Sequence, residues 1–530
     1  MPKDEMSNCR LQSHGLIQKV LCQPMNITVT FISAIITGII AHLYMFVNKL
    51  PNMDDVGAIT EYGQGARVGR WFLEVLGETT AELLGNYSMP LFNGIMTVFF
   101  LALSACIVVK MFEITDIGCC IFVGAVFVCF PAVITTLMFM FTAPYYGLAV
   151  FLAVLAAWCI SRERKYLNVC GVICLVLSTA IYQAYFPLSA SILLAKLIQD
   201  VEKEKPIKRV LQYGGCFFVG LIAYFVSSML FNRLFEVEMV SYKGADSMGQ
   251  ISVCTILENI PNTYKALVRL MTTGYMGLTE YRLLRILFAL FIAATICVLI
   301  YKFIMLIEIK KIWRAISVLV FAICYPLAVF SLYFSGGAEG FYSIVMYPVV
   351  MFYILPVILL GEVNKESVEE SRKRKWCKTI LNYVMSLAMV GVIFLYCRFS
   401  NEYYLWMQMD YEQTSSYFTT LVTQIKESEG YTKDIDVVIV GYSVEDDSIT
   451  GTDYFLDITL GTPNMLDCYN YRAFIQNYCG FGQINRELET EVCTWEEVME
   501  MPIYPEKGSI QNIRGIIVVK VMEENGPSIW

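Results

Sequence analysis

The sequence has little charge and almost no histidine. Only 16% of its 530 residues are charged, whereas 57% are hydrophobic and 14% are aromatic. That composition lies far outside the range of soluble domains and predicts a polytopic α-helical membrane protein. The two histidines, His14 in the N-terminal tail and His42 in the first apolar segment, nearly exclude histidine-based catalysis.

Other patterns are absent as well. No paired Cys-x-x-Cys motif or Cys/His zinc spacing occurs, and most of the 18 cysteines lie in apolar segments, where they act as small hydrophobic residues. No basic stretch suited to nucleic acid is visible, and no glycine-rich phosphate loop predicts a nucleotide-sugar site. No internal repeat supports the inverted symmetry of many transporters.

Apolar segments of about 20 residues predict about eleven membrane spans. Lys3, Arg10 and Lys19 precede the first segment, and no cleavage-site pattern follows it, so we expect a retained span rather than a signal peptide. The fifth and sixth segments are short and flank residues 182–187, so they are either two spans, one broken helix or a re-entrant pair. The segments are 28–50, 89–109, 117–140, 143–160, 167–181, 184–199, 209–230, 283–301, 315–334, 341–360 and 377–397.

Lysine and arginine asymmetry predicts the orientation. With a cytoplasmic N-terminus, all four strongly basic stretches fall on the cytoplasmic side of a cell membrane. The large loops 51–88 and 232–281, the turn 335–342 and the C-terminal region then lie outside. The basic stretches are 161–165, 202–209, 302–314 and 371–378.

The chain divides into two predicted domains, a transmembrane domain at residues 1–397 and a small extracytoplasmic α/β domain at residues 398–530. In the second, Tyr417–Gly430 has helical spacing of apolar residues, whereas residues 436–440 and 516–521 are dense in valine and isoleucine, which is typical of buried strands. In an oxidising compartment this domain would favour a disulfide among Cys468, Cys479 and Cys493.

The first outer loop is the first long polar interruption, and it begins with adjacent carboxylates. Asp54 and Asp55 are followed by Glu61. These groups are either solvated loop charges or the acid/base machinery of an enzyme without histidine. A carboxylate at a membrane surface can act as a general base, and a neighbouring pair can share a raised pKa or hold a divalent metal such as Mg²⁺ or Mn²⁺.

The same loop contains Arg67, Arg70 and Trp71. Arginine on the outer side opposes the positive-inside trend, so we expect an anionic partner such as a phosphate diester, which a guanidinium binds through two hydrogen bonds. Anchoring at the lipid interface is the alternative. Arg269 and Lys265 lie in a predicted amphipathic in-plane helix, residues 262–271, and are further candidates for phosphate contact.

Three polar or aromatic residues elsewhere on the outer side could contact a sugar. Tyr182 and Gln183 lie at the outer mouth between the two short segments, where an aromatic face and an amide suit a pyranose. An aromatic-belt residue and a capping amide are the alternative. Glu339 lies on a glycine-rich outer turn and is either a loop charge or a polar contact; Glu61 and Trp71 complete the candidate sugar and acceptor contacts.

With these elements in place, the order of the chain resembles the membrane-embedded glycosyltransferases of the GT-C type. More narrowly, it resembles the bacterial serotype-converting glucosyltransferase family, which decorates surface polysaccharide such as O-antigen from a polyprenyl-phosphate glucose donor. The segments that show the resemblance are Met53 to Ile59, Gly65 to Leu76, Ser88 to Lys110, Leu177 to Ile198 and Gly508 to Val521.

The resemblance implies that an acidic residue of the first outer loop is the catalytic base. It maps onto Asp55, our preferred base, or onto Asp54, its partner or a metal ligand. The chain departs from the expected pattern before the tenth predicted span, where Ala338, Glu339 and Gly340 stand in place of an arginine. Donor contacts from that turn are therefore not expected.

These observations predict an inverting hexosyltransferase that takes a sugar, most simply glucose, from polyprenyl phosphate and adds it to a cell-surface polysaccharide. Its partners would be membrane lipids, the lipid-linked donor, the polysaccharide acceptor and a separate donor-lipid synthase and flippase. Two rival classes are a flippase or transporter, which would need ionisable residues within its spans, and a non-catalytic protein that binds wall polymer, which would tolerate loss of Asp54 and Asp55.

Overall fold

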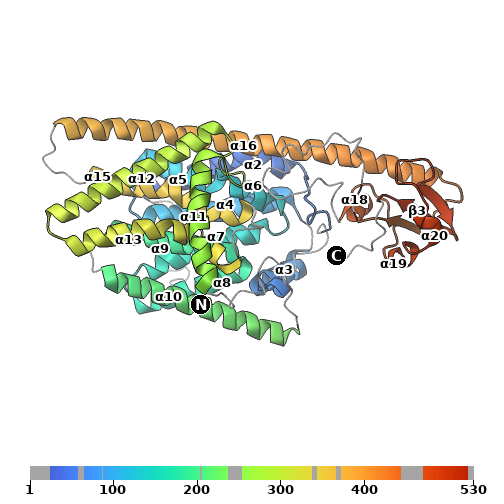
Figure 1. Cartoon of the computed structure of the whole chain (residues 1–530), viewed down its shortest axis with the longest axis horizontal. Coiled ribbons are helices and arrows are strands. Elements are labelled where there is room, and N and C mark those ends of the chain that lie inside the picture. Colours follow the sequence, from blue (N-terminus) through green and yellow to red (C-terminus); the bar gives the residue numbers. More distant parts are fainter. Residues whose placement is uncertain are drawn as a thin grey trace, which may run out of the picture.

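A bundle of long helices and a small domain at one end make up the molecule (Figure 1). The computed structural model describes residues 24–57, 65–85, 88–202, 206–236, 253–336, 343–365, 372–442, 444 and 470–522.

Nine helical segments in the described residues are long and apolar enough to cross a membrane. Their polar residues are few, and side chains facing away from the bundle are large and apolar, as lipid contact requires. The predicted membrane protein is thereby confirmed. The segments are α2 (Met25–Val47), α4 (Pro90–Met111), α5 and α6 (Ile117–Cys129, Pro131–Met138), α7 (Ala143–Ile160), α10 (Pro206–Leu234), α12 (Arg282–Glu308), α13 (Ile312–Val329), η3 and α15 (Ser343–Val350, Met351–Lys365), and α16 (Arg372–Glu427).

The fifth and sixth predicted spans are two separate short helices, α8 (Lys165–Ile181) and α9 (Phe186–Asp200), joined by the turn η2 (Gln183–Tyr185). Extended backbone at Tyr182 ends α8, and Pro187 lies in the first turn of α9. Both helices bind α7 through serine hydroxyls: Ser178 donates to the carbonyl of Ala149 at 2.7 Å, and Ser189 donates to that of Ala153 at 2.8 Å. At about 1.5 Å per residue each is shorter than a full span.

Small residues bring the first helices into close contact. A Cβ atom placed on Gly124 of α5 would lie 2.4 Å from the carbonyl oxygen of Thr30 on α2. One placed on Gly38 of α2 would lie 2.6 Å from Val98 on α4. In a membrane, where apolar side chains gain nothing by leaving lipid, such close backbone approach is a main source of helix association.

The basic stretches meet at one end of the bundle, which we term the basic face. Arg209 lies 3.3 Å from Glu163, so the start of α10 is joined to the link between α7 and α8. Lys302 near the end of α12 lies 2.6 Å from Glu362 of α15 and 3.8 Å from Glu202 after α9. The described residues of three basic stretches, 161–165, 202, 206–209 and 302–314, are therefore gathered at the same end, as the topology prediction requires.

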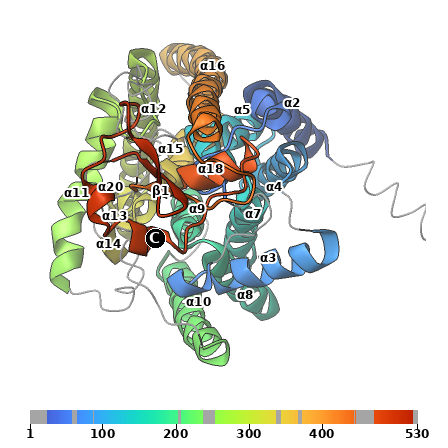
Figure 2. The ribbon, with the colours of Figure 1, turned by 90° about the vertical axis from the view of Figure 1, so that its right-hand side faces the viewer.

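The opposite end, which we term the Asp55 face, consists of the loop 51–57, the α6–α7 link 139–142, the η2 turn and the C-terminal domain. Helices α3 (Trp71–Leu84) and α11 (Val253–Thr272) are seen from the side in Figure 2, which views α16 along its length. Both lie across the bundle. The predicted amphipathic helix at residues 262–271 is thus part of the longer α11.

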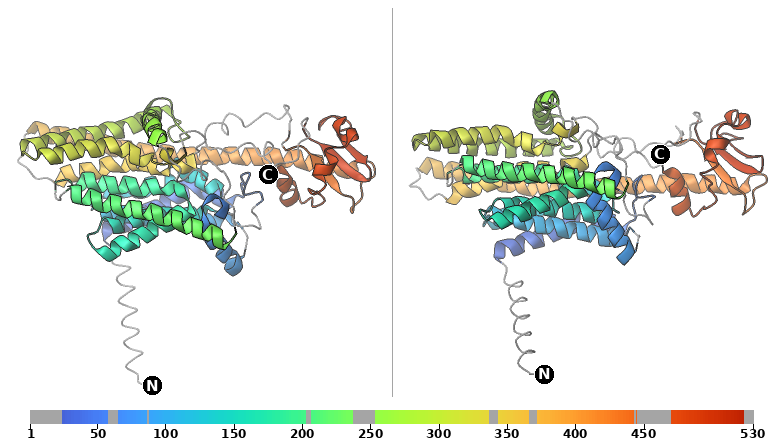
Figure 3. Two further views of the ribbon diagram at one scale, coloured as in Figure 1. Left: turned by 60° about the horizontal axis from the view of Figure 1, so that its bottom comes forward. Right: turned by 90° about the horizontal axis from the view of Figure 1, so that it is seen from below.

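The helix α16 runs across the predicted domain boundary at residue 397. The sequence predicts a span at 377–397 and a separate helix at 417–430, but residues Arg372–Glu427 form one continuous helix of 56 residues. At 1.5 Å per residue this is about 84 Å, well over twice the thickness of a hydrocarbon core. Figure 3 shows it running from the bundle into the C-terminal domain. The hydropathy changes near Arg398 because the surroundings of the helix change, although its backbone is unbroken.

The C-terminal domain, which we term the module, packs a three-stranded sheet on the end of α16. β1 (Val437–Val440) pairs in parallel with β3 (Ile516–Lys520), and β2 (Ile510–Ile513) pairs with β3 in antiparallel fashion. The two predicted strands are confirmed, and the short β2 was not predicted. Helices α18 (Tyr471–Asn477), α19 (Glu489–Val492) and α20 (Glu496–Met499) lie between β1 and β2 in the sequence.

The interior of the module is held by apolar packing and one buried ion pair. Phe418 of α16 lies in its core, and Arg472 of α18 is 1% exposed and pairs with Glu489. Cys479 and Cys493 are free thiols, so they form no disulfide with each other; Cys468 lies outside the described residues. Burial raises the pKa of both thiols.

The orientation leads to a testable prediction. An alkaline phosphatase fused after Trp530 should be active, because the module would lie outside the cytoplasm, whereas one fused near Arg374 or after Arg164 on the basic face should be inactive. Green fluorescent protein at the same three positions should give the reverse pattern. A cytoplasmic C-terminus would contradict this orientation, because with a cytoplasmic N-terminus it requires an even number of spans.

Candidate functional site

The loop after α2 turns Asp55 inward. The Asn52 side-chain oxygen accepts hydrogen bonds from the backbone N–H groups of Asp54 at 3.0 Å and Asp55 at 2.8 Å. An asparagine that caps the next residues in this way makes a tight turn. As a result Asp55 is 8% exposed, whereas the Asp54 beside it is only half-buried.

The Asp55 carboxylate is held at the N-terminal end of α7. The backbone N–H of Phe141 donates to its Oδ1 at 3.1 Å. Burial raises the pKa of Asp55 to about 7, although the Phe141 hydrogen bond and the positive charge of Lys49 oppose the rise. Lys49 is itself partly buried: burial lowers its pKa, and the negative charge of Asp55 raises it. A carboxylate tuned in this way can accept a proton near neutral pH, as a general base must.

The two carboxylates do not form a metal-binding cluster. Among the described side chains, no group of three or more metal-binding residues is gathered, here or elsewhere. One oxygen of Asp55 accepts an N–H, and the cationic group whose charge acts on it is Lys49. That set differs from the ring of oxygen ligands that Mg²⁺ or Mn²⁺ requires. We therefore derive no step through a metal.

Arg70 lies on a tyrosine cluster beside the same end of α7. Its guanidinium carbon is 4.6 Å from the ring centre of Tyr182, and its Nη1 is 3.4 Å from the hydroxyl of Tyr146. The rings of Tyr146 and Tyr182 are stacked 4.6 Å apart, and Tyr185 meets Tyr182 edge-on. A guanidinium above an aromatic face has its N–H groups in the plane of the group, a direction from which they can donate to an anion.

The backbone around Arg70 is fixed by two side chains from the bundle. The Gln183 amide nitrogen donates to the Val68 carbonyl at 2.8 Å and to the Tyr224 hydroxyl at 3.0 Å, and that hydroxyl donates to the Gly69 carbonyl at 3.0 Å. Gly69 has a φ of +78°, and a Cβ there would lie 2.7 Å from the Tyr224 oxygen, so only glycine fits. Gln183 thus positions the loop that carries Arg70, and its amide nitrogen already donates two hydrogen bonds within the protein.

Other predicted site residues lie apart from this arrangement. Arg67 is exposed. Trp71 stacks on Phe231 of α10 at 5.8 Å. Arg269 of α11 lies over the ring of Tyr275, and no described contact joins it to Asp55 or Arg70. Glu61 and Glu339 lie outside the described residues.

Asp55 and Arg70 therefore each contact a residue at the N-terminal end of α7. Phe141, whose N–H donates to Asp55, lies two residues before the helix, and Tyr146, which contacts Arg70, lies in its first turn. The N-terminal end of a helix also has a partial positive charge that favours anions. Sequence reasoning missed Tyr146 and Lys49, although the stretch FTAPYYG at 141–147 carries a proline and two tyrosines where two spans meet.

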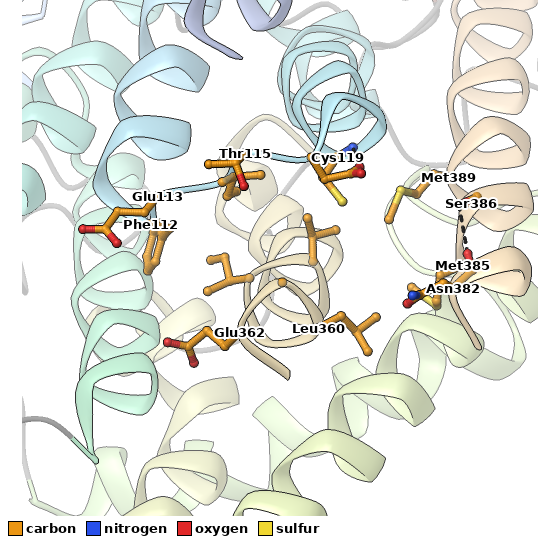
Figure 4. Close-up of a pocket in the computed structure, with 15 residues that line it drawn as sticks. Phe112, Glu113, Thr115, Cys119, Leu360, Glu362, Asn382, Met385, Ser386 and Met389 are labelled. Carbon is orange, nitrogen blue, oxygen red and sulfur yellow. Dashed lines mark hydrogen bonds between the residues drawn. The ribbon is translucent and has the colours of Figure 1, made fainter. Parts of the chain in front are cut away.

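A cavity of about 260 Å³ lies elsewhere, among the α4–α5 link, α15 and α16. Glu113 and Glu362 lie on one side of it and Asn382 and Ser386 on another (Figure 4). Because Glu362 pairs with Lys302, this cavity belongs to the basic face. It is separate from the Asp55 site, and we assign it no part in the reaction.

A buried carboxylate with a raised pKa and an arginine at one end of a bundle of apolar helices are typical of a membrane-embedded enzyme. The family model described as Glucosyl transferase GtrII matches residues 43–360, which is more than half of the chain. The chain therefore belongs to this family and is a membrane glucosyltransferase. The resemblance seen in the sequence is confirmed. No curated protein and no solved structure matches the chain.

The matched segment places the site within the family. Residues 43–360 include Asp55, Arg70, Tyr146 and Tyr182. They end within α15, before α16 and the module begin. The Asp55 site of the bundle thus lies inside the matched segment, whereas the module lies beyond it.

The raised pKa of Asp55 predicts how stability depends on pH. Because the pKa is about 7 in the folded chain and about 4 in the unfolded chain, ionisation of this group opposes folding. The loss of folding stability that this ionisation causes grows as pH rises from about 4 to about 7 and is constant above about 7. Asp55→Asn removes it while keeping an oxygen for Phe141, so its melting temperature relative to wild type should rise between pH 5 and pH 8.

Thermal unfolding in detergent, followed at several pH values, measures this difference. Asp54→Asn is the matched control, because it leaves the buried carboxyl in place and should follow the pH dependence of wild type. A constant offset between Asp55→Asn and wild type from pH 5 to pH 8 would contradict the assigned pKa.

Proposed function

We propose that this glucosyltransferase transfers glucose from a polyprenyl-phosphate donor to a cell-surface polysaccharide on the extracytoplasmic side of the cell membrane. The observation that supports the proposal is the joint placement of Asp55 and Arg70 at the N-terminal end of α7, on the face opposite the basic stretches. A lipid-linked donor keeps its chain in the bilayer and its phosphate at the membrane surface, where Arg70 lies.

Asp55 acts as the general base in the proposed mechanism. Its carboxylate takes the proton of an acceptor hydroxyl, and the oxygen attacks the anomeric carbon of the donor. The bond between that carbon and the phosphate oxygen breaks, and the electron pair leaves with the prenyl phosphate. A single displacement of this kind inverts the anomeric configuration. With a pKa of about 7, much of Asp55 is ionised near neutral pH, and its carboxylate is a stronger base than one with an ordinary pKa.

Arg70 binds the donor phosphate and stabilises the charge that develops on it. The guanidinium is positioned by the Tyr182 ring and by the loop that Gln183 and Tyr224 hold, so little reorganisation accompanies the reaction. A separate synthase and a flippase would supply the donor on this face. The tyrosine cluster next to Arg70 offers aromatic faces of the kind that pack on sugar rings.

The alternative hypothesis is that Asp55 has only a structural role, and an experiment must distinguish it from catalysis. Its hydrogen bond to Phe141 joins the first loop to the α6–α7 link, and a protein that transports or merely binds polymer could use the carboxylate for that purpose alone. Asparagine distinguishes the two, because it still accepts the Phe141 hydrogen bond but cannot accept a proton.

Asp55→Asn should reduce transfer about 10²- to 10⁴-fold, the usual contribution of a general base, without loss of folded protein. For wild type, kcat/KM should rise with pH and level off above about 7, because the ionised base is required. The assay uses purified protein, a short-chain prenyl-phosphate glucose and polysaccharide extracted from a deletion strain. Mass analysis should show one hexose fewer per repeat in that strain.

Asp54→Asn is the control and should retain most activity. If Asp55→Asn transferred glucose at a rate near that of wild type, Asp55 would be a structural residue and the base would have to be sought elsewhere. An unchanged polysaccharide in the deletion strain would argue against surface glucosylation altogether.

Replacement of Arg70 by lysine tests the phosphate contact. Arg70→Lys keeps the charge but loses the planar group that stacks on Tyr182, so we expect the donor KM to rise or kcat to fall by about tenfold or more. Arg67→Lys, at an exposed position three residues away, is the matched control and should be near wild type. Equal activity of both variants would assign Arg70 to interfacial anchoring.

A further inference from the structure

The module is docked on the loop that holds Asp55. The Asn470 side chain donates to the carbonyl of Met53 at 2.9 Å, and the Asn477 side chain donates to that of Val56 at 2.9 Å. Val56 is fully buried and belongs to the apolar core of the module, together with Phe418. The Asp55 loop is therefore bound on one side by the membrane bundle and on the other by the module.

Tyr478, which follows α18, contacts Lys49, the residue whose positive charge acts on the Asp55 carboxylate. Its ring stacks on Phe474 at 4.9 Å, meets Tyr411 of α16 at 5.9 Å, and lies under the ammonium group of Lys49 at 5.1 Å. Burial raises the pKa of Tyr478, and the charge of Asp55 raises it further, so the phenol stays protonated. Lys49 lies over the Tyr478 ring and its charge also acts on Asp55, so the two side chains share this neighbour.

The Tyr478 hydroxyl is buried and has no hydrogen-bond partner among the described residues. Buried hydroxyl groups in native proteins are nearly always satisfied, so one without a partner beside a reactive carboxylate indicates a position for a ligand group. A sugar hydroxyl suits it, because it can accept from the phenol and still donate to a carboxylate.

We propose that the module forms the acceptor side of the transfer site, and that the Tyr478 hydroxyl donates a hydrogen bond to the acceptor sugar whose hydroxyl Asp55 deprotonates. This inference rests on the proposed function. Tyr478 transfers no proton: Asp55 receives the acceptor proton, and the prenyl phosphate leaves with the electron pair. The contact fixes the acceptor oxygen beside the base and so contributes to acceptor binding.

The extent of the family match has a consequence for specificity. The matched segment ends at residue 360, whereas Asn470, Asn477 and Tyr478 lie beyond it. A carboxylate and an arginine inside the matched segment would serve the chemistry and the donor. A module outside the matched segment could then change which acceptor is bound without altering the base.

Tyr478→Phe tests the contact, because phenylalanine keeps the ring on Phe474 and under Lys49 and removes only the hydroxyl. With short-chain prenyl-phosphate glucose and polysaccharide extracted from a deletion strain, we expect the acceptor KM to rise about tenfold, the effect of one lost hydrogen bond. The donor KM, the pH dependence of kcat/KM and the melting temperature should stay near wild type.

Tyr442→Phe is the matched control, because it removes a hydroxyl from an exposed tyrosine of the same module. Asn477→Ala, which weakens the docking on Val56, should also raise the acceptor KM. Unchanged acceptor kinetics in Tyr478→Phe, or an effect on the donor KM alone, would overturn the inference. If at the same time Asp55→Asn is inactive, the proposed function stands; an active Asp55→Asn would instead remove the proposed base.

Discussion

The hydrogen bond between the Phe141 N–H and the Asp55 carboxylate is the contact on which the arrangement of the site depends. It joins the loop after α2 to the start of α7, and it keeps a carboxylate in a buried position that would otherwise favour solvent. Burial costs the ionised form more than the backbone N–H and Lys49 recover, so the group titrates near neutrality. The same feature that makes Asp55 unfavourable for folding makes it suitable for accepting a proton.

The continuous helix α16 explains how the module is held against the loop that carries Asp55. Because α16 is unbroken, it fixes the position of the module relative to the bundle. Phe418, near the end of this helix, lies in the module core. The two asparagines of the module then bind backbone carbonyls on either side of Asp55. Two attachments, one through α16 and one through the loop, restrict the module far more than a flexible linker would.

Much of the fold was predictable because its signals are local. Apolar length identified the long helices, and the tyrosine-glutamine-proline break between α8 and α9 was recognised as irregular. The strands β1 and β3 were predicted from runs of valine and isoleucine. The continuity of α16 was missed because hydropathy reports surroundings rather than backbone, and β2 was missed because four residues of mixed polarity carry little periodicity.

The sequence by itself determined the class and the family, because composition and segment order are properties of a linear chain, and its charge asymmetry predicts an orientation. It also drew attention to Asp55 and Arg70, since charge in an apolar chain is rare. Only the tertiary structure decided that Asp55 is the buried member of its pair, that Arg70 rather than Arg67 meets the tyrosine cluster, and that Tyr478 lies near the carboxylate. Burial and proximity depend on residues more than 400 positions apart, as with Asn470 and Met53, and no local pattern encodes such a contact.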